Sequence, residues 1–172
     1  LGCPFVTSDG LANLCGLKNL CRMQISGDRL DDALPSFLSK LPKLVLLEIN
    51  SKNFTDKGFA DLKKIANLQT LTVSSPGVTD RSLTFLKDMK NLQTVNFEQC
   101  NFSRDFGLKF QPARKLYGLS LIGQRSFSVA SAKALSKTNI AILNLKGSAI
   151  FDDQLIALAQ LKNLSSLNIE GA

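Results

Sequence analysis

The reactive side chains of this 172-residue chain do not form the patterns that catalysis or metal binding requires. Histidine, the commonest zinc ligand and the usual general base for a serine or cysteine nucleophile, is absent. The chain has no glycine-rich phosphate loop. No two of the cysteines have the spacing of a metal site; they are Cys3, Cys15, Cys21 and Cys100. The sequence therefore predicts a protein that is not an enzyme and that uses no cofactor and no metal.

The composition is that of an ordinary globular protein, with 44% apolar and 20% charged residues. No apolar run approaches the ~20 residues that a helix needs to cross a bilayer, so we expect no transmembrane segment. A chain of this length can bury a core of its own, and we therefore expect free thiols rather than a disulfide framework. Free thiols favour a cytoplasmic location, and a surface-attached or secreted effector is the alternative.

A repeat in the sequence predicts the secondary-structure elements of the chain. The segment "NLQTLTV" begins at Asn67 and the similar "NLQTVNF" begins at Asn91, which is 91 − 67 = 24 residues later. The residues three and five positions after each repeat anchor are also apolar. We expect one domain over residues 1–172. A solenoid needs a capping unit at each end, and no cap follows the last repeat, so we expect the chain to be a fragment of a longer protein. The apolar anchors are Leu20, Leu44, Leu68, Leu92, Leu116, Ile140 and Leu164.

Each repeat reads as a strand followed by a short helix. The apolar residues after each anchor are two apart, which is the period of a strand with one buried face. Those before it, such as Phe59, Leu62 and Ile65, are three apart, which predicts a helix with one apolar stripe. In the sixth repeat Phe127 comes one residue late, which predicts an insertion in the turn that a shorter helix end balances.

Polar residues flank the predicted helices. Asp56, Asp80 and Asp152 stand at the helix starts, where we expect their carboxylates to cap the free N–H groups. The fifth repeat has Arg104 at this position. Asparagine tolerates the left-handed conformation that ends helices, and it precedes five anchors, as Asn19, Asn67, Asn91, Asn139 and Asn163.

Two segments carry the repeat most fully, "FTDKGFADLKKIANLQTLTV" (54–73) and "VTDRSLTFLKDMKNLQTVNF" (78–97). Their L-x-x-L-x-L and T-D-x-x-x-L patterns resemble the leucine-rich repeat family, in particular the "LTDxGL" repeats of many bacterial proteins. They depart from the longer, cysteine-containing repeats of F-box proteins, because only Cys100 falls at such a position. The resemblance implies an α/β solenoid shaped as an arc or horseshoe, in which a right-handed β–α superhelix places a parallel sheet on the concave side and helices on the convex side.

The resemblance also implies that partners dock on the concave face, which the strand residues between the buried rows would form. Small polar residues dominate these positions, and we expect Tyr117, Ile122 and Ile142 to add one apolar patch. The predicted contact residues are Arg22, Gln24, Leu46, Glu48, Thr70, Thr72, Thr94, Asn96, Glu98, Tyr117, Ser120, Ile122, Ile142, Asn144 and Lys146.

The net charge of +7 has a structural interpretation. Lysines fall late in the predicted helices or just past them, and aspartates fall at the helix starts, which is the arrangement that the helix dipole favours. A basic rim that attracts an acidic protein or an anionic membrane is the alternative. Because the expected concave face lacks a basic groove with interleaved aromatic residues, nucleic acid is not the expected partner.

The sequence therefore predicts a non-catalytic module that binds a protein partner through its concave face and adjoining loops. The alternative is a structural spacer or scaffold within a larger surface, secreted or effector protein. The uncapped end repeats also suggest end-to-end self-association.

Overall fold

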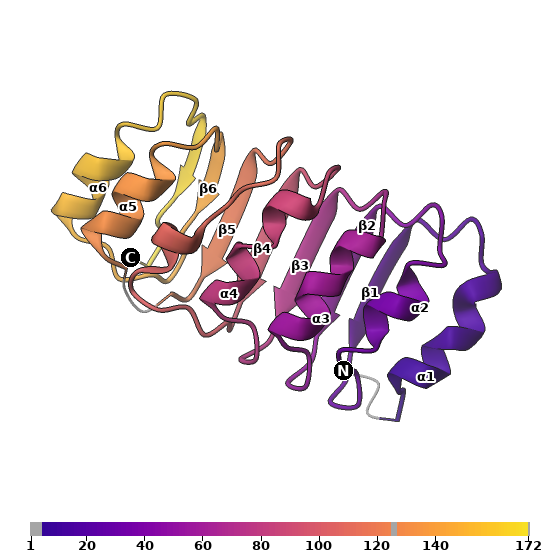
Figure 1. The fold of residues 1–172 in the computed structure, drawn as a ribbon. Coiled ribbons are helices and arrows are strands. Elements are labelled where there is room, and N and C mark those ends of the chain that lie inside the picture. Colours follow the sequence, from indigo (N-terminus) through magenta and orange to yellow (C-terminus); the bar gives the residue numbers. More distant parts are fainter. Residues whose placement is uncertain (1–4, 125–126, 172) are drawn as a thin grey trace.

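In a computed structural model of the protein, residues 5–124 and 127–171 are described. Seven parallel strands form one open sheet in chain order (Figure 1). The helical segments cover one face of this sheet and leave the concave face uncovered. Neighbouring strands pair in the register of the repeat, with Met23 opposite Leu47 and Leu71 opposite Val95. The predicted strands are thus confirmed. Their bounds are β1 Arg22–Ser26, β2 Leu46–Asn50, β3 Thr70–Ser74, β4 Thr94–Glu98, β5 Gly118–Ile122, β6 Ile142–Asn144 and β7 Ser166–Asn168.

The returning segments are short, and several of them are 3₁₀ helices (η) for part or all of their length. The fifth repeat has no α-helix, only η4. No helix among the described residues has the length and apolar character needed to cross a membrane. The segments are α1 Ser8–Leu11, η1 Ala12–Gly16, α2 Leu34–Leu38, α3 Asp56–Asp61, η2 Leu62–Lys64, α4 Asp80–Leu83, η3 Leu86–Asp88, η4 Phe106–Lys109, α5 Val129–Leu135 and α6 Asp152–Leu158.

The core lies between the sheet and the helical segments. The anchors Leu44 and Leu92 stand just before β2 and β4 and are completely buried, as are the strand residues Leu47 and Val95. The shift in the sixth repeat is confirmed, because Phe127 is completely buried although it comes one residue late. Most of the inserted turn, residues 125–126, lies outside the described residues. The local periodicity therefore predicted the interior of the molecule well.

The prediction of aspartate caps was wrong. The residue before each aspartate caps the helix instead, since the hydroxyls of Thr55 and Thr79 accept hydrogen bonds from the first turns of α3 and α4. At α6 the residue at the cap position is Phe151, and Asp152 is the first residue of the helix. Threonine hydroxyls are good cap acceptors, and their presence one residue earlier leaves the carboxylates available for other contacts.

The prediction of left-handed asparagines was also wrong. Among the described residues, Gln99 is the one non-glycine residue with a positive φ, at 51°. The asparagines instead link neighbouring repeats. Asn67 Nδ2 donates to the Pro42 carbonyl over 2.7 Å, and Asn91 Nδ2 donates to the Ala66 carbonyl over 2.9 Å. Their conserved spacing within the chain thus reflects hydrogen bonds along the stack.

The apolar rows are less buried at the two ends of the stack than in its middle. Leu167 and Ile169 were predicted to be buried, but they are 41% and 38% exposed. At the other end, Leu17 of the first apolar stripe is 50% exposed. Because β7 pairs with β6 alone and β1 pairs with β2 alone, these residues have a packing neighbour on one side only.

Candidate interaction surface

The concave face is built from the strand residues that alternate with the buried ones, and hydrogen bonds join its side chains across strands. Gln24 Nε2 donates to Glu48 Oε2 over 2.8 Å, between β1 and β2. Asn96 Nδ2 donates to Thr72 Oγ1 over 3.1 Å, between β4 and β3. Each pair is 24 residues apart in the chain, so the strand register creates these contacts. They restrain the rotamers of an otherwise solvent-facing surface.

Most predicted contact residues lie at the surface. Arg22, Gln24 and Lys146 are exposed, as are Tyr117 and Ile142, whose exposed fractions are 41% and 42%. Lys146 lies in the turn after β6 rather than in a strand, because β6 ends at Asn144. The partly exposed members are Leu46, Glu48, Thr70, Thr72, Thr94, Asn96, Glu98, Ile122 and Asn144.

Ser120 departs from the prediction because it is buried. Its hydroxyl makes no hydrogen bond to any described residue. The strand register sets it between Asn96 on β4 and Asn144 on β6, and these larger neighbours limit its access to solvent. Ser120 is therefore the one predicted contact residue that is buried.

The predicted apolar patch separates into two parts. The register pairs Ile142 with Gly118 at the start of β5, and Tyr117 directly precedes that glycine. Ile122 stands at the other end of β5, opposite Glu98. Four residue steps along β5, roughly 13 Å, separate the two register positions. The prediction of one patch was thus wrong, since residues on adjacent strands share a patch only when they also share a register position.

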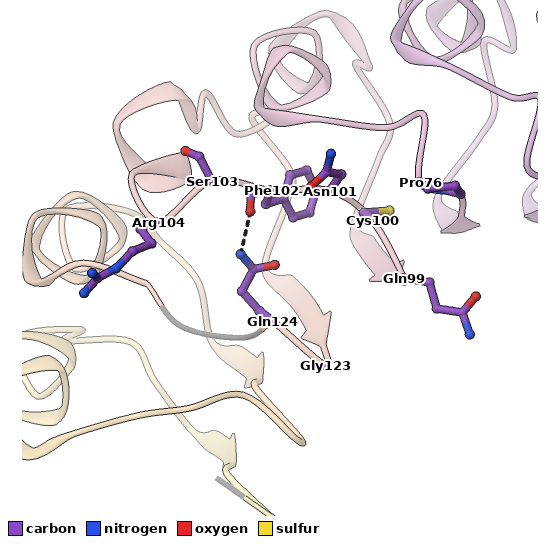
Figure 2. Close-up of a pocket in the computed structure, with 9 residues that line it drawn as sticks. All are labelled: Pro76, Gln99, Cys100, Asn101, Phe102, Ser103, Arg104, Gly123 and Gln124. Atoms are coloured by element: carbon purple, nitrogen blue, oxygen red, sulfur yellow. Dashed lines mark hydrogen bonds between the residues drawn. The ribbon is translucent and has the colours of Figure 1, made fainter.

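A cleft of about 730 Å³ opens beside the concave face, in the loops that follow β3, β4 and β5 (Figure 2). Figure 2 shows Gln124 reaching across it to Phe102, whose carbonyl accepts a 3.0 Å hydrogen bond from Gln124 Nε2. We call it the strand-end cleft. Its lining residues are Pro76, Gln99, Cys100, Asn101, Phe102, Ser103, Arg104, Gly123 and Gln124.

The strand-end cleft lies where the turn after the strand changes its conformation. In the second and third repeats a serine closes this turn, and Ser51 Oγ donates to the Leu30 carbonyl over 2.6 Å. In the later repeats the equivalent residue is left-handed, as at Gln99 and Gly123. The loss of serine after Ser75 at this repeat position, to Gln99 and then Gly123, accompanies the change, and it was not used in predicting the site.

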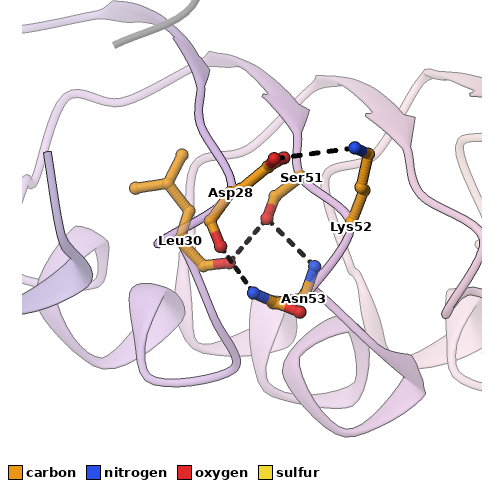
Figure 3. A network of polar contacts seen from close by, with 5 residues as sticks. All are labelled: Asp28, Leu30, Ser51, Lys52 and Asn53. Carbon is orange, nitrogen blue, oxygen red and sulfur yellow. Dashed lines mark hydrogen bonds and ion pairs between the residues drawn. The ribbon is translucent and has the colours of Figure 1, made fainter. Parts of the chain in front are cut away.

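The serine-type turn is held by a small polar network (Figure 3). The backbone N–H of Asn53 donates to Ser51 Oγ over 3.2 Å, and Asn53 Nδ2 donates to the Asp28 carbonyl. Lys52 and Asp28 form a 3.6 Å ion pair that is largely exposed, so it contributes at most about 1 kcal/mol. The backbone contacts, rather than this ion pair, fix the turn.

Cys100 in the strand-end cleft is held as a neutral thiol. Burial raises the pKa of its thiol to about 12, and the thiol makes sulfur hydrogen bonds to the carbonyls of Val73 and Glu98. The thiolate is therefore scarce near neutral pH. Cys15, Cys21 and Cys100 are free thiols, and Cys3 lies outside the described residues. In the described part of the chain, no three cysteine, aspartate or glutamate side chains gather as metal ligands would.

Comparison with protein-family models finds no match, and comparison with curated protein sequences finds none. Solved structures do match. Listeria monocytogenes internalin inlF covers 92% of this chain at 18% identity with a TM-score of 0.61. TLR13 in its complex with ssRNA13 covers 95% at 20% identity, TM-score 0.65. Drosophila Toll in its complex with Spatzle covers 99% at 14% identity, TM-score 0.51.

These neighbours are leucine-rich repeat proteins, and the present fold is a leucine-rich repeat solenoid of the same kind. At identities of this level the likeness concerns the fold alone. The chain spans 44% of the internalin, 23% of TLR13 and 29% of Toll. The internalin is therefore more than twice as long as the segment that it shares with this chain.

Proposed function

We propose that the chain is a non-catalytic module that binds a protein partner through its concave face and the adjoining strand-end cleft. The observation that carries this proposal is the cross-strand pairing of side chains such as Gln24 with Glu48 and Asn96 with Thr72. A surface whose rotamers are already restrained loses less entropy when it binds. Tyr117 and Ile142, exposed beside this restrained region, supply the apolar contact that interfaces concentrate at their centre.

The concave face alone is smaller than a standard protein interface, so we include the strand-end cleft in the proposed binding surface. Seven strands at ~4.8 Å make a sheet about 29 Å across, and with strands roughly 16 Å long the concave face has an area on the order of 450 Å². A standard interface needs about 800 Å² from each partner. The loops around the strand-end cleft adjoin the face and extend the surface that one partner can cover.

A protein fits this surface better than RNA. Among the neighbours, Toll is in a complex with Spatzle, whereas TLR13 is in a complex with ssRNA13. Single-stranded RNA binding uses successive aromatic platforms along a basic groove. On the concave face Tyr117 is the one aromatic residue among the predicted contacts, and Arg22 and Lys146 are far apart on β1 and after β6.

The test compares partner capture by two matched double variants. Glu98→Lys with Tyr117→Ala changes the concave side, and Asp153→Lys with Ile156→Ala makes the same kinds of change on exposed residues of α6. Each partner that wild type captures is identified by mass spectrometry, and its affinity for the purified chains is then measured. We expect the first variant to lose at least about tenfold in affinity, or roughly 1.4 kcal/mol, and the second to bind like wild type.

Equal affinity of both variants for the partner would show that the concave face does not bind it. If the chain alone captured no partner that a longer parent protein captures, the spacer or scaffold alternative would be favoured. Circular dichroism and thermal unfolding of both variants show whether a loss of binding reflects a loss of the fold.

A further inference from the structure

Basic side chains line one edge of the solenoid, where the helical segments end and the strands begin. This edge runs along the upper side of Figure 1. The acidic residues that accompany them there are Asp61 and Asp88. We call this row the basic edge; it consists of Lys18, Lys40, Lys43, Lys63, Lys64, Lys87, Lys90, Arg114, Lys115, Lys137 and Lys162, all of them exposed.

The helix dipole explains part of the basic edge: Lys63, Lys64 and Lys87 stand in the last turns of η2 and η3, as expected from sequence, whereas the other eight members lie beyond the helical segments. The dipole acts within the last turn of a helix. The last turns of η1, α2 and α6 contain no basic residue. Lys43, Lys115 and Lys162 lie four or more residues beyond the preceding helical segment, and Lys40 and Lys137 lie two beyond. The row as a whole therefore follows the edge of the molecule rather than the ends of individual helices.

The positive charge along the edge is hardly compensated. Lys64 pairs with Asp61 over 3.0 Å. Lys43 Nζ and Lys115 Nζ donate to asparagine oxygens, those of Asn19 and Asn91, over 2.9 and 2.8 Å. These neutral acceptors orient the ammonium groups and leave their charge in place. On the opposite edge the exposed charges are mixed: the acidic residues Asp9, Asp28, Asp31, Asp105, Asp152 and Asp153 stand beside the basic residues Arg29, Lys52, Lys57, Arg81 and Arg104.

We propose that the basic edge docks on an anionic lipid bilayer, with the strands roughly normal to the membrane. In a stack of equal repeats the same edge of every repeat lies along one side, so these groups can meet a flat surface together over about 29 Å. Near an anionic bilayer each lysine or arginine raises the partition coefficient roughly fivefold. Exposed Leu17 and Tyr117 stand at the same edge, and tyrosine is enriched at membrane interfaces.

The residue types distinguish a membrane from other polyanions. Sites that recognise a carboxylate or phosphate at a defined position favour arginine, whose planar guanidinium binds with two parallel hydrogen bonds. Lysine carries a hydrated point charge on a flexible side chain and imposes no such geometry. Arg114 is the one arginine in the row. Single-stranded nucleic acid binding would in addition need successive exposed aromatic residues, and the edge has Tyr117 alone among the described residues. Mobile lipid headgroups suit a row of lysines that has no fixed fork geometry.

The test is co-sedimentation of the chain with phosphatidylcholine vesicles that contain no or about 30% phosphatidylserine. The edge variant carries Lys87→Gln, Lys90→Gln, Arg114→Gln and Lys115→Gln. The control variant loses the same charge on exposed residues elsewhere, through Lys52→Gln, Lys57→Gln, Arg81→Gln and Lys133→Gln. We expect wild type and control to bind the anionic vesicles, less at about 0.5 M than at about 0.1 M salt. The edge variant, which loses four such charges, should partition on the order of 1,000-fold less.

Three results would overturn the proposal: no binding of wild type to anionic vesicles, equal binding to vesicles without phosphatidylserine, or an equal loss in both variants. Parallel titrations use polyglutamate and a single-stranded oligonucleotide. Tight, edge-dependent binding to either of these without vesicle binding would assign the edge to an acidic protein or a nucleic acid instead. The substitutions do not overlap with those that test the concave face, so each proposal fails or stands independently of the other.

Discussion

At the scale of single residues, one aspartate in each of three successive repeats links neighbouring units. Asp32 accepts from the backbone N–H and the hydroxyl of Thr55, over 2.8 and 2.7 Å. Asp56 accepts the same pair of bonds from Thr79, over 2.9 and 2.6 Å, and Asp80 accepts an equivalent pair from Ser103. The carboxylates of Asp32 and Asp56 thus orient the threonines that cap α3 and α4. Asp80 orients Ser103, which stands at the equivalent position in the fifth repeat. These bonds connect units that are far apart in sequence, which is the nearest-neighbour coupling that stabilises a solenoid.

Replacing Asp56 tests this linkage. Asp56→Ala removes the acceptor for Thr79 and for the Ser82 hydroxyl, so we expect the free energy of unfolding to fall by about 2 to 4 kcal/mol. Urea titration followed by circular dichroism measures the change. The matched control is Asp153→Ala, an exposed aspartate in the first turn of α6, which should cost less than about 1 kcal/mol. Similar losses in both variants would show that the inter-repeat bonds contribute little.

At the scale of elements, the fifth repeat keeps its place without an α-helix because aromatic rings and a close backbone contact hold it. Phe106 of η4 lies 5.9 Å from Phe102 and 5.8 Å from Phe127, between ring centroids. Phe102 in turn contacts Phe97 of β4 edge-on at 5.0 Å. The rings continue the core from the fourth repeat to the sixth. The backbone N–H of Gly107 donates to Ser131 Oγ of α5 over 3.1 Å.

Gly107 sets how closely η4 approaches α5. A Cβ atom at Gly107 would lie 2.6 Å from the Ser131 Cα and carbonyl oxygen, and this backbone cannot move away easily. We therefore expect Gly107→Ala to lower the free energy of unfolding by about 1 to 3 kcal/mol through overpacking. Gly16→Ala is the control, because nothing lies within 4 Å of its added methyl group. Thermal unfolding of both variants measures the difference, and an unchanged Gly107 variant would contradict the close approach.

At the scale of the whole molecule, stability should be graded along the stack. Each inner repeat packs against two neighbours, whereas β1 and β7 pair on one side only. Val95 and Phe97 in the middle strand are buried, whereas Leu167 in β7 is 41% exposed. Opening a terminal repeat breaks one interface, while opening a central one breaks two. The two proposed surfaces are placed differently with respect to this gradient, since the basic edge runs through all repeats and the strand-end cleft lies near the middle.

Hydrogen exchange of the 172-residue chain measures this gradient. We expect the strand amides of β7 and β1 to exchange faster than those of β3 and β4, because local opening at the ends requires less free energy. The difference should amount to at least about tenfold in the protection factor, or roughly 1.4 kcal/mol. Uniform protection from β1 to β7 would indicate that the stack opens as one cooperative unit.

The sequence by itself determined the repeat, the strand positions and the buried rows. These features depend on a side-chain period of two or three residues within one repeat, and periodicity of this kind can be read along the chain. Leu47, Leu71 and Val95 were therefore placed correctly, and so was the shifted Phe127. The list of concave residues follows from the same alternation, which is why most of its members lie at the surface.

The tertiary structure decided what depends on contacts between repeats. The roles of Asp56 and Asn91, the burial of Ser120 and the exposure of Leu167 are set by residues more than 20 positions away in the chain or by the lack of a neighbouring strand. The strand-end cleft likewise arises where two turn conformations meet between adjacent repeats. A pattern within one repeat specifies which side chains point inward, but only the stacked repeats specify what those side chains meet.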